Sequence, residues 1–398
     1  MRPDDFFRMS DVFMFQIPRK IVFGNGAIRR IGEEAANIFA GKKILMVTDK
    51  GVVQAGLTKE AVDSLKKSGF QVITFDRVLP DPPVNVVIEC IELARKERVD
   101  IIFGIGGGSS IDAAKAVSLF VPYEGDIYSC IGLAINQVKN PGLPKIFIPT
   151  TAGTGADLSN SFVLTNDRTN EKISSNTPYA FSDLSIIDPE LTLNLPPKIT
   201  AESGMDAFSH SLESFVSLQA NPLSDLFALR GMELISKNIG KAYSHGPKSP
   251  EARYAMCFAV CMGTMALRSS RGGAIHPTCY PLAMKYHLTH GLSISLMMPY
   301  VMEFNLASDL KRFAAVASAM GERIEGFSTE EAAQVAVKAV KRLIGDLGLP
   351  LRLRDIGVKK EDFGEFARFV AKKYPHYLAS NPRKVSEQDI IGIYESAW

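Results

Sequence analysis

The chain has 398 residues, of which 46% are hydrophobic and 22% charged, and its formal net charge is +2. This length favours two domains over one core, and the composition is ordinary for a soluble globular protein. The small net charge argues against a polyanionic partner, so we expect no nucleic-acid binding. No apolar stretch reaches about 18 residues, and the start does not resemble a signal peptide, so no membrane association is expected.

The five cysteines are an odd number and include no C-x-x-C pair. Cys257 and Cys261 share a helix face, which fits either small buried residues or metal ligands. Because no second cluster accompanies them, burial is the favoured interpretation. A reducing, cytoplasmic environment is therefore expected.

The first half of the chain alternates short β-rich runs with helical segments. Strands are expected at 20–24, 43–49, 71–76, 100–108 and 145–151. Amphipathic helices are expected between them, at 57–69, 85–99 and 111–120. This βαβαβ rhythm predicts a parallel sheet with helices on both faces.

The pattern changes after about Pro196, where long helical periodicities replace strand-like runs. Helices are expected at 222–239, 250–269, 309–321, 329–346 and 360–373. The turn-rich segment 186–200 is the best linker candidate. We therefore predict an α/β dinucleotide-binding domain over 1–195 and an all-helical metal and substrate domain over 196–398.

A glycine-rich turn lies between an expected strand and helix, in the sequence IGGGSSIDAAK. Gly106, Gly107 and Gly108 would let backbone N–H groups approach a phosphate at the helix N-terminus. Ser109 or Ser110 could add a hydroxyl donor, and Asp112 could fix the turn or reach a ligand. Because this is not the G-x-G-x-x-G pattern, a plain tight turn is an equal alternative.

Two further segments favour a nucleotide. The loop PTTAGTGAD, at 149–157, is crowded with hydroxyls and glycines suited to lining a phosphate or nicotinamide. Asp49 ends an expected strand, where its carboxylate could accept hydrogen bonds from an adenosine ribose. Such a carboxylate would repel a 2′-phosphate, which favours NAD over NADP. The alternative for Asp49 is a helix or turn cap.

Four residues form a set of three nitrogen ligands and one oxygen ligand, in a chain with six histidines. Asp206 and His210 stand at i and i+4, so on a helix both side chains lie on one face. His276 and His290 each adjoin a proline or a glycine. The set suits a divalent transition metal such as Fe(II) or Zn(II), which can polarise an alcohol or aldehyde oxygen.

These motifs together resemble the iron-containing (group III) alcohol dehydrogenases. The resemblance extends from FQIPRKIVFGNGAI through GGGSSIDAAK, PTTAGTG and GMDAFSH to HPTCYPLAMKYHLTHG, and so covers nearly the whole chain. It implies an α/β nucleotide-binding domain followed by a helical metal domain, with an architecture like that of dehydroquinate synthase. It also implies homodimers or larger assemblies.

The resemblance assigns roles to individual residues. The metal ligands would be Asp206, His210, His276 and His290. The cofactor-binding residues would be Asp49, Gly106, Gly107, Gly108, Ser109, Asp112, Thr150, Thr151, Thr154 and Lys172.

The chain departs from the family pattern at Tyr280, where a second histidine is common. Tyrosine can donate a hydrogen bond or relay a proton, but its pKa near 10 makes it a poor base at neutral pH. Either Tyr280 or another group handles the proton, or the position matters only for shape. His287 is an alternative relay, whereas His245 and His376 are expected to be loop or surface residues.

A second departure precedes His276, where Arg268 and Arg271 replace an apolar, Asn-rich run. Two guanidinium groups near the site could bind a carboxylate, sulfonate or phosphonate. The alternative is that both arginines point outward or pair with acidic residues.

The combined interpretation is a metal-dependent, NAD-linked alcohol dehydrogenase or aldehyde reductase acting on a small substrate that could carry an anionic group. One alternative is an enzyme like dehydroquinate synthase, which uses NAD and a metal. The other is a non-catalytic nucleotide-binding protein with a structural metal.

Overall fold

The computed structural model describes residues 12–398, which divide into two compact units. One unit comprises Ile17–Leu193. The other comprises Asn194–Trp398 together with the described N-terminal residues 12–16. Within the described residues, no helix has the length and apolarity needed to cross a membrane.

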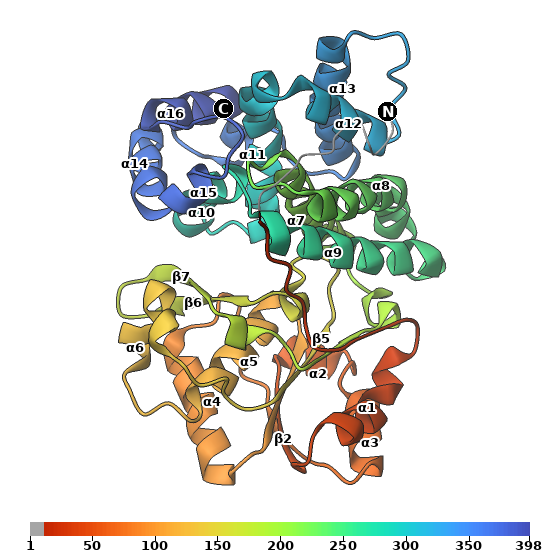
Figure 1. The fold of residues 1–398 in the computed structure, drawn as a ribbon, viewed down its shortest axis with the longest axis vertical. Helices are drawn as coiled ribbons and strands as arrows, with labels where there is room; N and C mark the ends of the chain where they lie inside the picture. Colours follow the sequence, from red (N-terminus) through yellow and green to blue (C-terminus); the bar gives the residue numbers. More distant parts are fainter. Residues whose placement is uncertain (1–11) are drawn as a thin grey trace. The chain divides into compact units, whose positions relative to one another are not determined.

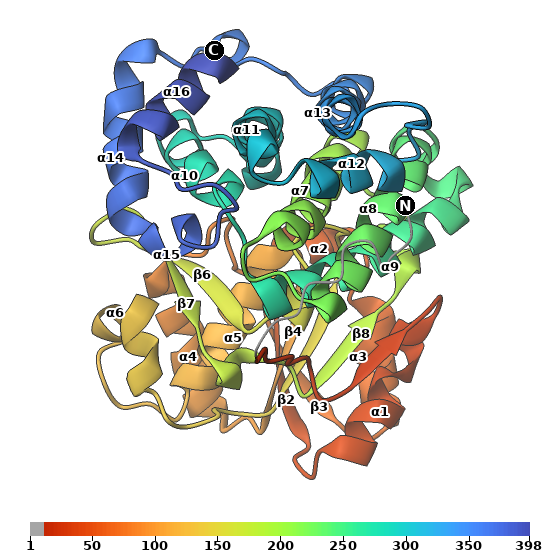
Figure 2. The same ribbon diagram turned by 45° about the horizontal axis from the view of Figure 1, so that its top comes forward.

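The unit Ile17–Leu193 is built on a parallel six-stranded sheet in the order β1-β8-β5-β4-β2-β3. Its strands are β1 (Ile21–Phe23), β2 (Lys43–Val47), β3 (Gln71–Phe75), β4 (Ile101–Gly106), β5 (Lys145–Pro149) and β8 (Leu184–Ile187). Strands β2, β3, β4 and β8 of this sheet are marked in Figure 2. The predicted parallel sheet is therefore confirmed.

Helices cover both faces of this sheet. They are α1 (Ile31–Ile38), α2 (Lys50–Gln54), α3 (Lys59–Lys67), α4 (Val84–Glu97), α5 (Gly108–Phe120) and α6 (Ile127–Cys130). Figure 1 shows α4 on one side of β2, with α1 and α3 on the other.

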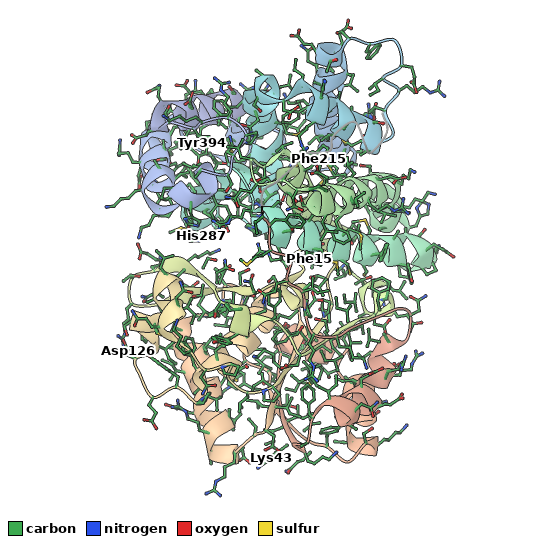
Figure 3. The ribbon with its side chains drawn as sticks, viewed as in Figure 1. Phe15, Lys43, Asp126, Phe215, His287 and Tyr394 are labelled. Atoms are coloured by element: carbon green, nitrogen blue, oxygen red, sulfur yellow. The ribbon has the colours of Figure 1, made fainter. Side chains whose placement is uncertain are left out.

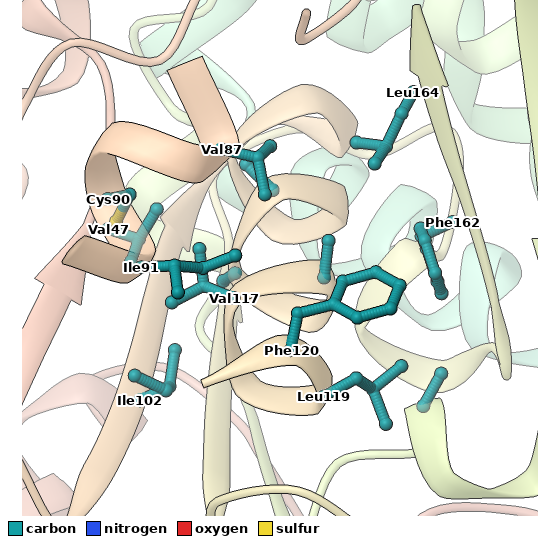
Figure 4. Packing of buried hydrophobic residues seen from close by; sticks show 14 of the residues in the cluster. Val47, Val87, Cys90, Ile91, Ile102, Val117, Leu119, Phe120, Phe162 and Leu164 are labelled. Atoms are coloured by element: carbon teal, nitrogen blue, oxygen red, sulfur yellow. The ribbon is translucent and has the colours of Figure 1, made fainter. Parts of the chain in front are cut away.

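Successive residues of β2 point to opposite faces and enter different cores. Leu45 and Val47 join the cluster with α4 and α5, and Ile44 and Met46 join the cluster with α1 and α3. Figure 4 shows Val47 packed with Ile91 of α4 and other apolar residues of the first cluster. Burial on both faces explains why these strands read as continuous apolar runs.

The sequence analysis did not predict an antiparallel hairpin, β6 (Ser161–Asn166) and β7 (Glu171–Asn176). It also did not predict β8, whose last residues open the segment that was expected to be a linker. The two omissions have different causes. Runs of four to six residues rich in serine, threonine and asparagine carry little hydrophobic periodicity, and β8 is too short to show any.

The unit that includes Asn194–Trp398 has helices and no strand in its described part. The helices are α7 (Pro197–Val216), α8 (Pro222–His245), α9 (Pro250–Ser270), α10 (Ile275–Tyr286), α11 (His290–Asn305), α12 (Leu310–Ala319), α13 (Thr329–Asp346), α14 (Phe363–Lys373), α15 (Pro375–Leu378) and α16 (Glu387–Ala397). The helical second half is confirmed, with ends shifted by a few residues from those expected.

Buried polar contacts join the helices of this unit. The Arg312 guanidinium pairs with Asp225 and lies 4.1 Å from the centre of the Phe215 ring, which ties α12 to α8 and α7. The Tyr394 hydroxyl of α16 donates a hydrogen bond of 2.7 Å to the Thr278 carbonyl of α10. Phe215 and Tyr394 are both marked in Figure 3. These contacts fix the helices that carry the candidate site.

Candidate metal centre and nucleotide edge

Helix α7 carries two of the four predicted ligands on one buried face. Asp206 and His210 are 2% and 7% exposed, and their side chains come together as the i, i+4 spacing predicts. Pro197 occupies the first turn of the helix, where its missing N–H leaves no unsatisfied bond.

The other two predicted ligands are histidines in the first turns of their helices. His276 is the second residue of α10, and His290 is the first residue of α11. Gly291 lets α11 approach α7 closely, because a Cβ atom at Gly291 would lie 2.2 Å from the Glu202 carbonyl oxygen. The two helix starts thus bring both imidazoles to Asp206.

Three of the four predicted ligands converge on a carboxylate oxygen of the fourth, Asp206. The Nε2 atoms of His210, His276 and His290 lie 3.6, 3.7 and 3.5 Å from Asp206 Oδ1. That oxygen is buried and accepts no hydrogen bond. Ligands placed tetrahedrally at about 2.1 Å from a metal ion are about 3.4 Å apart, so these spacings fit a bound ion.

The tightest part of this cluster is the group Asp206, His276 and His290, whose candidate ligand atoms lie within 4.8 Å of one another. The His210 ring stacks on that of His276 with centroids 5.1 Å apart. His290 is the most accessible of the four, with 37% of its side chain exposed. Asp206, His210 and His276 are thus buried, and solvent reaches the cluster at His290.

The electrostatics of the cluster favour a cation. Burial would raise the pKa of the Asp206 carboxyl, but His210, His290 and His276 together hold it well below its ordinary value. Burial lowers the pKa of His210 to about 4, so this imidazole is neutral at pH 7. A neutral imidazole and an ionised carboxylate are the forms that bind a divalent metal.

Glu213 is a site residue that the sequence analysis missed. Its carboxylate, 2% exposed, contacts His276 Nδ1 and accepts backbone N–H bonds from Gly273 and Ile275 at 3.0 and 2.8 Å. A signal was present, because Glu213 stands seven residues after Asp206 and therefore on the same helix face. Only the fold brings His276 to it.

Tyr280 lies beside the cluster in an aromatic group. It stands one turn after His276, its ring is 6.0 Å from that of His290, and its ring is 4.8 Å from that of Tyr374. Burial and then the neighbouring Tyr377 raise the pKa of Tyr280 well above its ordinary value. Tyr280 is therefore a neutral phenol at physiological pH, a hydrogen-bond donor and not a base. The sequence analysis did not single out Tyr374 or Tyr377.

The two arginines before His276 have different surroundings. Burial lowers the pKa of Arg268, and its charge in turn helps to lower the pKa of His210, so its guanidinium is close to the cluster. Arg271 is exposed at the end of α9, with a positive φ of 75°. The structure brings only Arg268 to the cluster.

The remaining histidines lie outside the cluster. His287 is exposed and ends α10 in a left-handed conformation, at the position marked in Figure 3. His245 is exposed beside Ser244, and exposed His376 contacts the Tyr377 ring with centroids 4.8 Å apart.

In the α/β unit, the glycine turn lies at the point where the strand order reverses. From β2 the chain moves to β3 on one side and then to β4 on the other. Open parallel sheets bind ligands at the carboxyl ends of the strands beside such a reversal. Asp49 follows β2, and Gly106, Gly107 and Gly108 follow β4, so all four residues are at this edge.

Local contacts define the conformation of the turn. Gly106 has a φ of +147°, which favours glycine, and a Cβ atom at Gly108 would lie 3.1 Å from Thr154. Asp49 accepts bonds from the Val52 N–H and the Ser110 hydroxyl, each at 3.0 Å. The expectation that Asp49 could cap a helix is therefore met, and its carboxylate also faces the turn.

Other predicted cofactor residues surround the turn or support it. Thr150 donates its N–H to the Gly106 carbonyl at 2.9 Å, and Thr151 is the nearest neighbour of a Cβ atom placed at Gly107. Lys172 pairs with Asp81 at 2.7 Å, and the Asp81 N–H donates to the Ser109 hydroxyl.

Asp112 accepts the Val163 N–H at 3.0 Å and so joins α5 to the hairpin. Its burial raises its pKa to about 6.

Comparison with known proteins identifies the family. Residues 18–189 match the family described as iron-containing alcohol dehydrogenase, and residues 200–398 match the C-terminal region of that family. The chain belongs to the iron-containing alcohol dehydrogenases. It is an oxidoreductase of the alcohol dehydrogenase and aldehyde reductase class, so the two alternatives raised from the sequence are set aside.

Relatives and solved structures agree with this assignment. The 1,3-propanediol dehydrogenase of Citrobacter freundii is 36% identical over 97% of this chain and 99% of its own. A solved 1,3-propanediol oxidoreductase superposes with a TM-score of 0.93 at 35% identity, covering 97% of this chain and 100% of that one. The sulfoacetaldehyde reductase of Bifidobacterium kashiwanohense, solved with NAD+, has a TM-score of 0.87 at 27% identity, covering 98% and 99%.

We predict that Gly291→Ala displaces the start of α11. The added methyl group would meet the Glu202 backbone, which cannot move as a flexible side chain can. Overpacking of this kind costs about 1–3 kcal/mol, and His290 should shift with the helix. The free energy of unfolding, measured with denaturant, and the affinity for zinc should both fall.

Gly240→Ala is the matched control, because a Cβ atom at Gly240 meets nothing within 4 Å. It should leave zinc affinity unchanged and maintain or slightly raise stability. Equal behaviour of the two variants would contradict the proposed close approach.

Proposed function

We propose that this chain is an NAD-linked, metal-dependent alcohol dehydrogenase or aldehyde reductase. In this proposal residues 1–195 bind the dinucleotide, and residues 196–398 hold the metal and the substrate. The observation that carries it is the buried Asp206 Oδ1, which accepts no hydrogen bond and is surrounded by three imidazole nitrogens. A carboxylate oxygen buried in this way requires a positive partner.

Asp206, His210, His276 and His290 would hold the metal. Their donor set suits Fe(II) or Zn(II), and the family description supports iron. When bound, the ion would supply Lewis-acid chemistry by polarising the oxygen of the substrate. The accessible His290 side is the one on which that oxygen could approach.

NAD would bind at the carboxyl edge of the parallel sheet. Gly106, Gly107, Gly108 and Ser109 would receive the pyrophosphate at the start of α5, and Asp49 would accept the ribose hydroxyls. Thr150, Thr151, Thr154 and Lys172 would line the second side. Asp112 would support the turn indirectly, because it accepts the Val163 N–H and so joins α5 to the hairpin. The NAD+ complex of the Bifidobacterium relative supports this choice of cofactor.

In the reductive direction, bound NADH would supply the hydride for the carbonyl carbon and leave as NAD+, and the substrate oxygen would need one proton to become the alcohol hydroxyl. Tyr280, a neutral phenol, would donate a hydrogen bond that orients the oxygen. Because its proton is held tightly, Tyr280 would serve as an orienting residue or as one member of a proton chain.

The first test is turnover itself. Protein loaded with Fe(II) or Zn(II) should oxidise NADH with short aldehydes, and a chelator should abolish the reaction. His276→Ala should lose both the metal and the activity. Absence of turnover with every aldehyde by fully loaded protein would overturn the proposal.

A second prediction concerns Asp49→Asn. The amide oxygen can still accept the Val52 N–H, but the charge that repels a 2′-phosphate is gone. Loss of a charged hydrogen bond of about 1.5–3 kcal/mol should weaken NADH binding tenfold or more, and relative use of NADPH should rise. Kinetics with both cofactors would check this. An unchanged preference at an unchanged unfolding temperature would argue against the role of Asp49.

We also propose that the substrate is a short aldehyde carrying an anionic group. The half-buried Arg268 guanidinium, close enough to the metal cluster to lower the pKa of His210, is suited to a carboxylate, sulfonate or phosphonate. The sulfoacetaldehyde reductase among the solved relatives supports a sulfonate in particular. Arg271, exposed at the end of α9, is the weaker candidate for this role.

Arg268→Met should therefore raise KM for a sulfonated or carboxylated aldehyde by roughly 10–100-fold, since a charged hydrogen bond is worth about 1.5–3 kcal/mol. KM for a neutral aldehyde of the same length should change little. Arg271→Met is the matched control and should have a smaller effect. Unchanged KM for both aldehydes in both variants would remove the anion-binding proposal.

Self-association as a homodimer or larger assembly and a cytoplasmic location complete the proposal. Light scattering of the purified protein and cell fractionation would test these two points.

A further inference from the structure

The Glu213 carboxylate has three partners, all in the segment that enters α10. Its Oε1 accepts the N–H groups of Gly273 and Ile275, and its Oε2 contacts His276 Nδ1. All three partners therefore present a nitrogen to an oxygen of Glu213.

This acceptor decides which nitrogen of His276 carries a proton. Because the carboxylate can only accept, Nδ1 must be the N–H donor, which leaves Nε2 as the nitrogen whose lone pair a metal would take. Nε2 is the atom that lies 3.7 Å from Asp206 Oδ1. The ring is thus presented to the cluster in the form that can bind a metal.

We propose that Glu213 is a positioning residue for the metal centre, which fixes the tautomer and the orientation of His276. This inference rests on the proposed function, since it assumes that His276 binds the metal. It goes further by adding a residue, absent from the predicted site, on which the metal affinity depends.

A purely structural role is the competing explanation, because α10 has no side-chain cap of its own at Ala274. A second residue, however, anchors the same segment without contacting the imidazole. The Asn381 Oδ1 accepts the Ala274 N–H at 3.2 Å and pairs with the side chain of Asn305. Loss of Asn381 would loosen the segment but would leave the His276 tautomer unchanged.

Glu213→Gln separates the two explanations. If the amide oxygen keeps the two backbone N–H bonds, the amide NH2 group faces Nδ1 and donates to it. Nε2 would then carry the proton and could not bind a metal. If the amide is turned round, its NH2 group opposes two N–H donors, so the amide cannot satisfy all three partners.

The experiment measures Zn2+ affinity by chelator competition, the visible spectrum of the Co2+-loaded protein, and unfolding of the metal-free protein. Glu213→Gln should weaken Zn2+ binding by about 10–100-fold and alter the Co2+ spectrum. Asn381→Ala should lower the unfolding temperature but keep Zn2+ affinity within about threefold of the parent and leave the Co2+ spectrum unchanged.

Two results would overturn the inference. One is Zn2+ affinity of a folded Glu213→Gln variant within about twofold of the parent. The other is an equal loss of affinity in Asn381→Ala, which would assign Glu213 to anchoring alone. Failure of the parent to bind Zn2+ would instead refute the proposed function, so the two failures are distinguishable.

Discussion

The helical unit is organised around one buried charge, the Asp206 carboxylate. An ionised carboxylate buried without compensation would cost several kcal/mol, so its surroundings must provide positive charge. Three imidazoles from α7, α10 and α11 meet at its Oδ1. Each helix has to be held in register for this to happen, which is what the close approach at Gly291 and the acceptor at Glu213 achieve.

The acidic residues of this site perform different tasks because their neighbours differ. Asp206 faces imidazole nitrogens and has an oxygen without a hydrogen bond, which is the environment of a metal ligand. Glu213 is one turn beyond His210 and has every oxygen engaged by donors. Both residues are buried carboxylates, so residue type and burial do not distinguish Asp206 from Glu213. The number of hydrogen-bond donors at each carboxylate oxygen distinguishes them.

In the α/β unit, the parallel sheet performs a comparable task with the backbone. From β2 the chain connects to β3 on one side and then to β4 on the other. The loops that follow β2 and β4 therefore meet at one edge of the sheet. Glycine at position 106 is required by its positive φ. The Asp49 carboxylate then both caps α2 and contacts Ser110, so the cap and the candidate ribose acceptor are one group.

The sequence by itself determined the two-part architecture, the parallel sheet and the four candidate ligands, because these depend on periodicity, local spacing and motif order. Asp206 and His210 lie one turn apart on a single helix. The hairpin, Glu213, Tyr374 and the difference between Arg268 and Arg271 were decided only by the tertiary structure. Their roles arise from contacts between segments far apart in the chain, and no local pattern encodes which side chain a buried donor or acceptor will meet.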